Sequence, residues 1–375
     1  MTTVTAPAKP APTKRASASL SNDTLLKWLY DMQLIREFEN RTMQAYQQAK
    51  IGGFCHVYTG QEALVVGTFG SVNHDDPVVT AYRDHGHALA RGMSPRACMA
   101  EMFGKITGCA KGKGGSMHMF DKPNHLYGGH GIVGAQTALG AGLAFAVKYE
   151  LEVLKRDLAS GGKPKKRVAL CYLGDGALNQ GCLHEAMNLA GLYSLPVIII
   201  VENNGYSMGT SIGRGTTMAE DLTVKGKAYG MLSASFDGMN ILELYDKFRP
   251  IVDECREEQK PAFVDIKTYR YKGHSMSDPQ KYRTREEVEH YEKERDSIAM
   301  LAAHLMRDRN ALSEAQWNTM QEEIGEIVRD SITFADESPA PDPASELYSD
   351  VMVNPHPGMS PSGQYVQGAK NPLLD

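Results

Sequence analysis

Long apolar runs are missing from this chain of 375 residues. No stretch approaches the roughly 20 consecutive apolar residues with which a helix crosses a bilayer, so we expect no membrane among its partners. The basic residues are scattered and the formal net charge is −5, which leaves no electrostatic footprint for nucleic acid. The composition therefore favours an ordinary globular protein that binds neither membranes nor nucleic acids.

Closely paired cysteines are also missing. The cysteines show none of the short spacings typical of metal sites, and several lie in apolar or helical runs, where a reduced thiol behaves as a small hydrophobic group. They are Cys55, Cys98, Cys109, Cys171, Cys182 and Cys255. A reducing compartment is expected: the cytoplasm of a bacterium, or the mitochondrial matrix of a eukaryote.

The two ends of the chain differ in composition from its middle. The first twenty residues contain no acid and only one arginine, among prolines and small polar residues, which predicts a disordered arm over 1–21. A transit peptide is the second interpretation, although it would be richer in arginine. Residues 336–375, rich in Pro, Ser and Gly, predict an irregular tail. Residues 22–335, which open with an amphipathic helix over 22–46, predict a single α/β domain.

The middle of the chain alternates between apolar runs and helical patterns. "RVALCYL" (167–173) and "PVIIIVE" (196–202) are continuous β-rich runs, separated by a segment with helical periodicity. A third run, "AFVDIKTYRY" (262–271), follows further helical sequence. The pattern predicts an α/β fold with a doubly wound, mostly parallel sheet and helices on both faces.

Asp175 stands between two glycines where the first run ends, and Asn204 follows the end of the second. Ligands of such sheets bind beyond the carboxyl ends of the strands. Mg²⁺ takes one or two side-chain oxygens of this kind and completes its shell with phosphate and water, while glycines and a helix N-terminus accept a diphosphate. The alternative is that Asp-Gly after a strand is merely a turn.

One further enzyme class can be set aside. Asp175 could act as a nucleophile that accepts a phosphoryl group, but such enzymes need a second aspartate two residues later, and Ala177 occupies that place.

At these residues the sequence resembles a known family. "GDG" (174–176), then 26 residues, then "NN" is similar to the thiamine diphosphate signature. The surrounding motifs resemble the α subunits of the thiamine diphosphate-dependent 2-oxo acid dehydrogenases, and among them the decarboxylating component of pyruvate dehydrogenase. They are "FCHVYTGQEA", "AYRDHGH", "GCAKGKGGSMHMF", "GGHGIVGAQ", "ENNGYSMGTS" and "YRYKGHSMSDPQKYRTREE", within residues 25–335.

The resemblance implies a set of site residues. Mg²⁺ would be bound by Asp175, Asn204 and the backbone carbonyl of Tyr206. The cofactor, thiamine diphosphate, would be contacted by Tyr82, Arg83, Gly131, Val133, Asp175, Gly176, Ala177, Asn204, Tyr206 and His274. Two histidines would serve the reaction: His56 on the substrate side, and His274 in a mobile loop that closes on the diphosphate.

The resemblance also implies an activity and partners. We expect the α subunit of pyruvate dehydrogenase (acetyl-transferring), which decarboxylates pyruvate and passes the acetyl group to a lipoyl-bearing dihydrolipoyl acetyltransferase core. It would be active only as an α2β2 assembly, because the family's β subunit supplies the glutamate that assists deprotonation of the cofactor. The alternatives are a branched-chain 2-oxo acid or acetoin dehydrogenase α subunit, and a non-catalytic regulatory subunit that binds thiamine diphosphate.

Regulation by phosphorylation has weaker support. Ser275 and Ser277 occupy the loop that is phosphorylated in relatives with a dedicated kinase. The second serine that such relatives carry before "YRTRE" is replaced by Lys281, and the loop is one residue shorter.

Overall fold

The computed structural model describes residues 16–158, 161–347 and 349–350. Its centre is a six-stranded sheet in the order β2-β1-β3-β4-β8-β7, in which every neighbouring pair is parallel. The strands are β1 (Val78–Ala81), β2 (Leu126–His130), β3 (Ala169–Gly174), β4 (Val197–Asn203), β7 (Leu232–Asp237) and β8 (Ala262–Lys267). The predicted parallel α/β sheet is confirmed.

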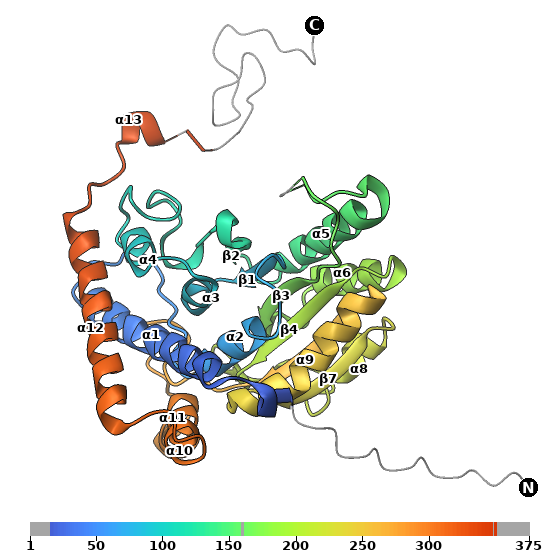
Figure 1. Ribbon diagram of the computed structural model, residues 1–375. Helices are drawn as coiled ribbons and strands as arrows, with labels where there is room; N and C mark the ends of the chain where they lie inside the picture. The colour runs from blue at the N-terminus through green and yellow to red at the C-terminus, as the bar shows by residue number, and fades with distance from the viewer. Residues whose placement is uncertain (1–15, 159–160, 348, 351–375) are drawn as a thin grey trace, which may run out of the picture.

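Helices surround this sheet (Figure 1). The α-helices are α1 (Asn22–Gln47), α2 (Glu62–Phe69), α3 (His85–Arg91), α4 (Pro95–Met102), α5 (Gln136–Tyr149), α6 (Gly181–Leu192), α7 (Ile212–Gly215), α8 (Thr223–Lys227), α9 (Ile241–Glu258), α10 (Arg285–Glu294), α11 (Ser297–Arg307), α12 (Glu314–Glu337) and α13 (Pro343–Glu346). Shorter elements are the 3-10 turns η1 (Ala16–Ser19), η2 (Gly115–Met117), η3 (Lys122–Asn124) and η5 (Asp175–Ala177), the π-helical turn η4 (Glu150–Leu154), and the hairpin of β5 (Tyr206–Ser207) and β6 (Thr210–Ser211).

The alternation of side chains along the strands creates two cores. In β3, Leu170 and Tyr172 pack into the core formed with α1, α2 and α9. Their neighbours Cys171 and Leu173 point to the opposite face, where they join the core formed with α5 and α6. Both faces are apolar, so the central strands read as continuous apolar runs in the sequence. Figure 1 shows α5 and α6 on one side of the sheet and α1 and α2 on the other.

The folded region extends beyond both predicted limits. Residues 1–15 of the predicted arm lie outside the described residues, but 16–21 are described and include η1. Ser17 is buried there because its backbone N–H and its hydroxyl both donate hydrogen bonds to Asp246. At the other end α12 runs to Glu337 and is followed by the short helix α13, within the segment predicted to be irregular.

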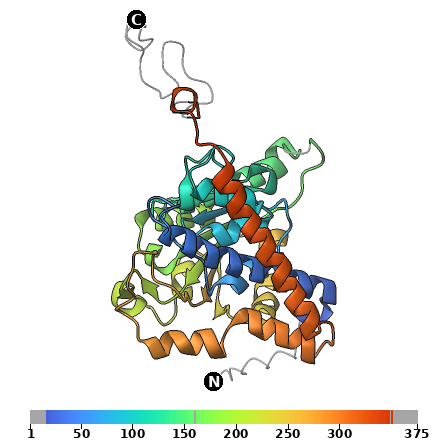
Figure 2. The ribbon, with the colours of Figure 1, turned by 90° about the vertical axis from the view of Figure 1, so that its left-hand side faces the viewer.

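The long helices close one side of the molecule. α1 begins after Ser21, whose hydroxyl caps the backbone N–H of Thr24, and ends one residue later than predicted. α12 packs against α1 and α4 and runs diagonally across that side (Figure 2). In the described part of the chain no helix combines the length and the apolar character that membrane crossing requires.

Candidate cofactor-binding site

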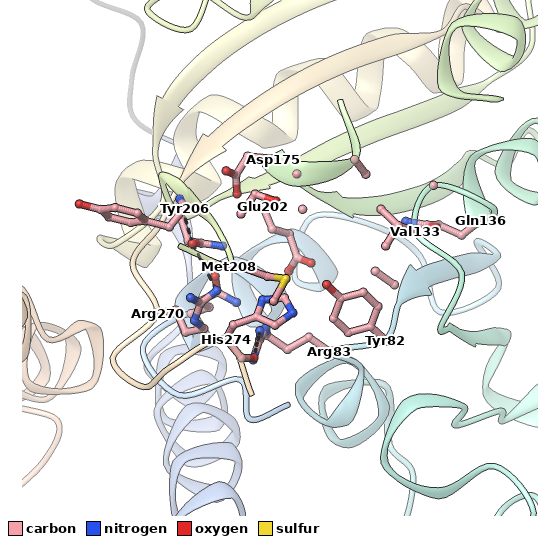
Figure 3. A pocket seen from close by; sticks show the side chains of 18 residues that line it. Tyr82, Arg83, Val133, Gln136, Asp175, Glu202, Tyr206, Met208, Arg270 and His274 are labelled. Atoms are coloured by element: carbon pink, nitrogen blue, oxygen red, sulfur yellow. Dashed lines mark hydrogen bonds between the residues drawn. The ribbon is translucent and has the colours of Figure 1, made fainter. Parts of the chain in front are cut away.

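A cavity of about 200 Å³ opens at the carboxyl ends of β3 and β4 (Figure 3). Most of the predicted cofactor residues line it, namely Tyr82, Arg83, Val133, Asp175, Gly176, Ala177, Asn204, Tyr206 and His274. A wider cavity of about 620 Å³, which we call the mouth, shares Tyr82, Val133 and His274 with the first and is also lined by His56 and Gly131. The structure therefore gathers all the predicted site residues in one region, and their roles remain predictions.

Asp175 lies in η5, directly after β3, and only 3% of its surface is exposed. Its Oδ2 atom has no hydrogen-bond partner. Burial raises the pKa of this carboxyl group to about 6, against the opposing effects of nearby backbone N–H groups and of Arg270. A buried carboxylate oxygen without a partner is well suited to a cation.

The turn at Asp175 differs from the prediction in one respect. The sequence predicts a helix N-terminus beside the diphosphate, but η5 and a further turn separate β3 from α6, which begins only at Gly181. Leu178 N–H bonds to the Asp175 carbonyl within that turn. The backbone groups nearest to the cavity are therefore those of the 3-10 turn.

The two asparagines at the end of β4 make different contacts: Asn203 is the last residue of the strand, and Asn204 follows it. Asn203 donates to the Asp265 carboxylate over 2.9 Å and is held in the sheet. Asn204 lines the cavity, and its Oδ1 atom accepts from Tyr206 N–H at 3.3 Å and from Arg270 Nη1 at 3.4 Å. The backbone of Asn204 also lowers the pKa of Asp175, so these two predicted metal ligands meet at the same place.

A metal ion at this place would be bound by only one carboxylate, and its other protein ligands would be oxygen atoms of other kinds. Among the described residues no group of three or more His, Cys, Asp or Glu side chains is placed to hold a metal ion. One carboxylate, one amide oxygen and one backbone carbonyl suit Mg²⁺, which completes its shell with phosphate and water. The Tyr206 side chain points away from Asp175 in Figure 3, and its hydroxyl donates to Glu287, so only its backbone would serve the metal.

Two buried arginines face the same cavity. Arg83 donates to the carbonyls of Val57 and His274 over 2.6 and 2.7 Å. Burial, and then the charge of Arg270, lower the pKa of Arg83 to about 10. In the described part of the chain neither guanidinium forms an ion pair with a carboxylate. The pocket therefore presents two guanidinium groups that are not held in ion pairs and that could contact a diphosphate.

Arg270 was missed by the sequence analysis. The run over 262–271 was predicted as one strand, which would have fixed its side chain by the alternation of the sheet, but β8 ends at Lys267. The chain then turns, and Arg270 Nη2 donates to the Tyr282 hydroxyl over 3.1 Å. The repeated aromatic and basic residues of "YRYKGH" were the only signal that the strand ends early. Glu202 and Gln136 line the same cavity and were also missed.

The rings of His56, Tyr82 and His274 meet where the cavity joins the mouth. The His56 ring lies 5.2 Å from that of His274 and 4.6 Å from that of Tyr82, centre to centre. Burial and the charge of Arg83 lower the pKa of His56 to about 3 and that of His274 to about 4. Both imidazoles are therefore neutral near pH 7, and Nδ1 of His56 is buried without a partner.

Glycines line the cavity where the backbone must stay close to its surroundings. A Cβ atom on Gly176 would overlap the side chain of Ser207, and one on Gly131 would approach the His118 ring to 3.0 Å. At Gly174 the corresponding space is open, which leaves room for a ligand against the strand end.

The fold and this site together define an α/β protein whose parallel sheet carries, at its carboxyl edge, a pocket lined by a buried carboxyl group and two buried guanidinium groups. The chain belongs to the dehydrogenase E1 component family, whose model matches residues 30–344, and this family depends on thiamine diphosphate. The family resemblance and the cofactor predicted from the motifs are confirmed.

Curated relatives agree with this assignment. The chain is 45% identical over 328 residues to the pyruvate dehydrogenase E1 component subunit alpha of Rickettsia bellii, covering 88% of this chain and 95% of the relative. It is 46% identical over 336 residues to the same subunit of Rhizobium meliloti, covering 90% and 92%. With the chloroplastic subunit alpha-3 of Oryza sativa it shares 38% identity over 358 residues, covering 95% and 82%.

Proposed function

We propose that this chain is the α subunit of a pyruvate dehydrogenase (acetyl-transferring). It would decarboxylate pyruvate with thiamine diphosphate and Mg²⁺ and deliver the acetyl group to the lipoyl group of an acetyltransferase core. The names of its relatives support the substrate. The observation that carries the proposal is the buried Asp175 carboxylate, which has an oxygen without a partner and faces a cavity with two unpaired guanidinium groups.

Different residues at the cavity would bind the metal ion, the diphosphate and the rest of the cofactor. Asp175, Asn204 and the Tyr206 carbonyl hold Mg²⁺, while Arg83 and Arg270 neutralise the diphosphate. The remaining contacts to the cofactor come from Tyr82, Gly131, Val133, Gly176, Ala177 and His274. Because each arginine already donates to carbonyl oxygens, its guanidinium is fixed before the cofactor arrives and loses little side-chain freedom on binding.

Neutral histidines suit the chemistry of the mouth. Bound thiamine diphosphate would supply the carbanion equivalent that adds to the carbonyl group of a 2-oxo acid. It would also stabilise the negative charge that remains when carbon dioxide leaves. His56 and His274, which are uncharged near pH 7, can each donate one N–H to the substrate or the cofactor and accept a hydrogen bond at the other ring nitrogen. His56 serves the substrate side and His274 the diphosphate side.

A second chain completes the site in this proposal. The mouth is open to solvent and bordered by exposed apolar side chains, of which Ile132 has 77% of its surface accessible. Further exposed apolar residues lie on α5 and α6, including Leu189 and Leu192. Surfaces of this kind are typical of obligate partners. We assign the partner as a β subunit that contributes the glutamate needed to deprotonate the cofactor, in an α2β2 assembly.

Coexpression with the β chain tests this function. A pyruvate-dependent dye-reduction assay with thiamine diphosphate and Mg²⁺ should show turnover for the pair and none for this chain alone. Asp175→Ala should abolish cofactor binding, measured by calorimetry, without unfolding the chain. Asp253→Ala, which removes one partner of a surface ion pair on α9, is the matched control.

Each alternative has its own outcome in that assay. Faster turnover of 2-oxoisovalerate than of pyruvate would identify a branched-chain enzyme, and acetoin as the preferred substrate would identify an acetoin dehydrogenase. Cofactor binding without turnover of any of these substrates in the presence of β chains would indicate a regulatory subunit. Turnover by this chain alone would refute the dependence on a β subunit. The compartment stays a prediction: bacterial cytoplasm or mitochondrial matrix.

A further inference from the structure

The glycine-rich loop between α4 and β2 wraps around a single buried carboxylate. Glu101, near the end of α4, is fully buried. Its Oε2 atom accepts the backbone N–H groups of Ala110 and Gly112 over 2.7 and 2.9 Å, and its Oε1 atom accepts those of Gly114 and Gly115 over 2.7 and 3.1 Å. In the described part of the chain this carboxylate forms no ion pair, so backbone dipoles alone stabilise its charge.

The glycines of "GCAKGKGG" are required by this wrapping. A Cβ atom on Gly108 would overlap the Glu101 side chain. Gly112 has a φ of +73° and lies against the backbone of Gly104, and Gly115 has a φ of +62°. These conformations are open to glycine and strained for other residues. The loop is therefore shaped by Glu101 and is not simply a flexible connection.

The end of this loop forms one wall of the mouth. Met117 lines that cavity together with His56 and His274. The following residue, His118, places its ring beside Gly131, a predicted cofactor contact. The backbone just before Met117 is also held in place, because the Ser116 hydroxyl forms a hydrogen bond with the His85 ring over 2.8 Å.

We propose that Glu101 is a positioning residue for the 2-oxo acid. By holding the four N–H groups it sets the place of Met117 and His118, and so the width of the passage through which the substrate approaches the cofactor. The inference rests on the proposed function of this site. Glu101 lines neither the cavity nor the mouth, and the predicted diphosphate and metal ligands lie on other segments, so it should act on the substrate and leave cofactor binding largely unchanged.

Glu101→Gln is the direct test, because glutamine has nearly the same shape. One amide oxygen can still accept two N–H groups, but the NH2 group faces the other pair and repels it. In the α2β2 enzyme we expect the KM for pyruvate to rise roughly 10-fold. A change of this size corresponds to the loss of about one net hydrogen bond that holds the loop in place. The Kd for thiamine diphosphate should stay within about twofold of the wild-type value.

A second variant changes the loop without altering a buried side chain. Gly115→Ala adds a methyl group in open space, so it disturbs only the backbone conformation at the last contact with Glu101. It should raise the KM in the same direction and by less. Glu322→Gln, on the exposed face of α12, is the matched control and should behave as wild type. Hydrogen exchange at residues 110–115 should become faster in both loop variants.

The outcomes separate this inference from the proposed function. Wild-type turnover of pyruvate decides the function, whereas the ratio of variant to wild type decides the role of Glu101 for whichever 2-oxo acid is used. A raised KM with an unchanged cofactor Kd, and a shift in the ratio of kcat/KM for 2-oxobutyrate to that for pyruvate, would support positioning. A proportional loss of kcat and melting temperature with wild-type KM in Glu101→Gln, or wild-type KM and exchange rates in Gly115→Ala, would overturn it.

Discussion

Among the described residues, three ionisable side chains at the cavity are buried without forming an ion pair. Asp175 has an oxygen without a hydrogen bond, and Arg83 and Arg270 donate only to uncharged oxygen atoms. Each of these groups loses hydration that the protein alone does not replace. The proposed diphosphate and metal ion would carry both signs of charge and satisfy all three groups, which would account for a pocket built at the expense of the stability of the empty protein.

Arg270→Lys should weaken cofactor binding even though it keeps the charge. The guanidinium fork contacts the Lys272 carbonyl, the Tyr282 hydroxyl and Asn204 at once, and an ammonium group cannot reproduce that geometry. We expect the Kd for thiamine diphosphate, measured by calorimetry in Mg²⁺, to rise roughly 10-fold or more. Arg249→Lys, in a surface ion pair, should leave it unchanged. An equal Kd for both variants would remove Arg270 from the site.

The pH dependence of stability should reveal Asp84, which follows Arg83. Burial raises the pKa of Asp84 from 3.8 to about 7. Because the folded pKa exceeds the unfolded one, the protonated group stabilises the fold fully below pH 4, and this stability is lost as the pH rises through about 7. From pH 6 to pH 8 the loss is about 1 kcal/mol.

Asp84→Asn should remove the part of the loss that Asp84 contributes, since an amide does not ionise and can still accept the Met119 N–H, while Glu202, whose pKa burial also raises to about 7, accounts for a remaining loss. The measurement is urea unfolding of the chain at both pH values, without cofactor and with a chelator present. Asp253→Asn, on the exposed face of α9, is the control. If Asp84→Asn loses as much stability as the wild type between pH 6 and pH 8, the titrating group lies elsewhere.

Sequence patterns located the site residues better than they located their partners. Asp175 and Asn204 were predictable because strand ends and glycines mark them. The different contacts of Asn203 and Asn204 could not be predicted. They depend on Asp265, which lies far from Asn203 in the sequence and next to it only in the sheet. The carboxylate Glu101 was equally hidden, since nothing in α4 signals four backbone donors in another segment.

At the scale of elements, the turn η5 and the hairpin of β5 and β6 depend on each other. Gly176 lies so close to Ser207 that a methyl group would displace the hairpin, and with it the Tyr206 carbonyl. Gly176→Ala should cost about 1–3 kcal/mol in the cofactor-bound state through overpacking. The double variant Gly176→Ala with Ser207→Gly should recover most of the affinity, because the clash partner is gone.

Calorimetric titration of the four proteins, wild type, both single variants and the double variant, measures this coupling. Additive effects of the two substitutions would show that the hairpin does not respond to Gly176.

Three inner strands could be predicted, whereas the short inner strand β1 and the two outer strands could not. β3, β4 and β8 are buried on both faces and read as apolar runs. β2 contains two glycines and a histidine, and β7 is only partly buried with several serines or small residues. These strands form because a neighbouring strand offers hydrogen bonds, which is a tertiary cause that no local pattern contains.

At the scale of the molecule, the apolar face of α5 and α6 should govern assembly. Leu192 has 68% of its surface exposed at the end of α6, next to Tyr193. Leu192→Lys places a charge there and is compatible with the helix C-terminus. We expect a loss of the α2β2 species in size-exclusion chromatography with light scattering, and a corresponding loss of activity at low protein concentration.

Gln321→Lys on α12 introduces the same charge at an exposed polar position and should assemble normally. Intact tetramers of Leu192→Lys would place the β subunit on another face.

The C-terminal segment lies against the loop that Glu101 holds. Lys111 and Lys113 pair with Glu346 and Asp350 on the outer side of that loop. The described chain begins, by contrast, at η1 beside α9, on the opposite side of the molecule in Figure 1. Removing Glu346 and Asp350 would therefore deprive both lysines of this loop of these acidic partners.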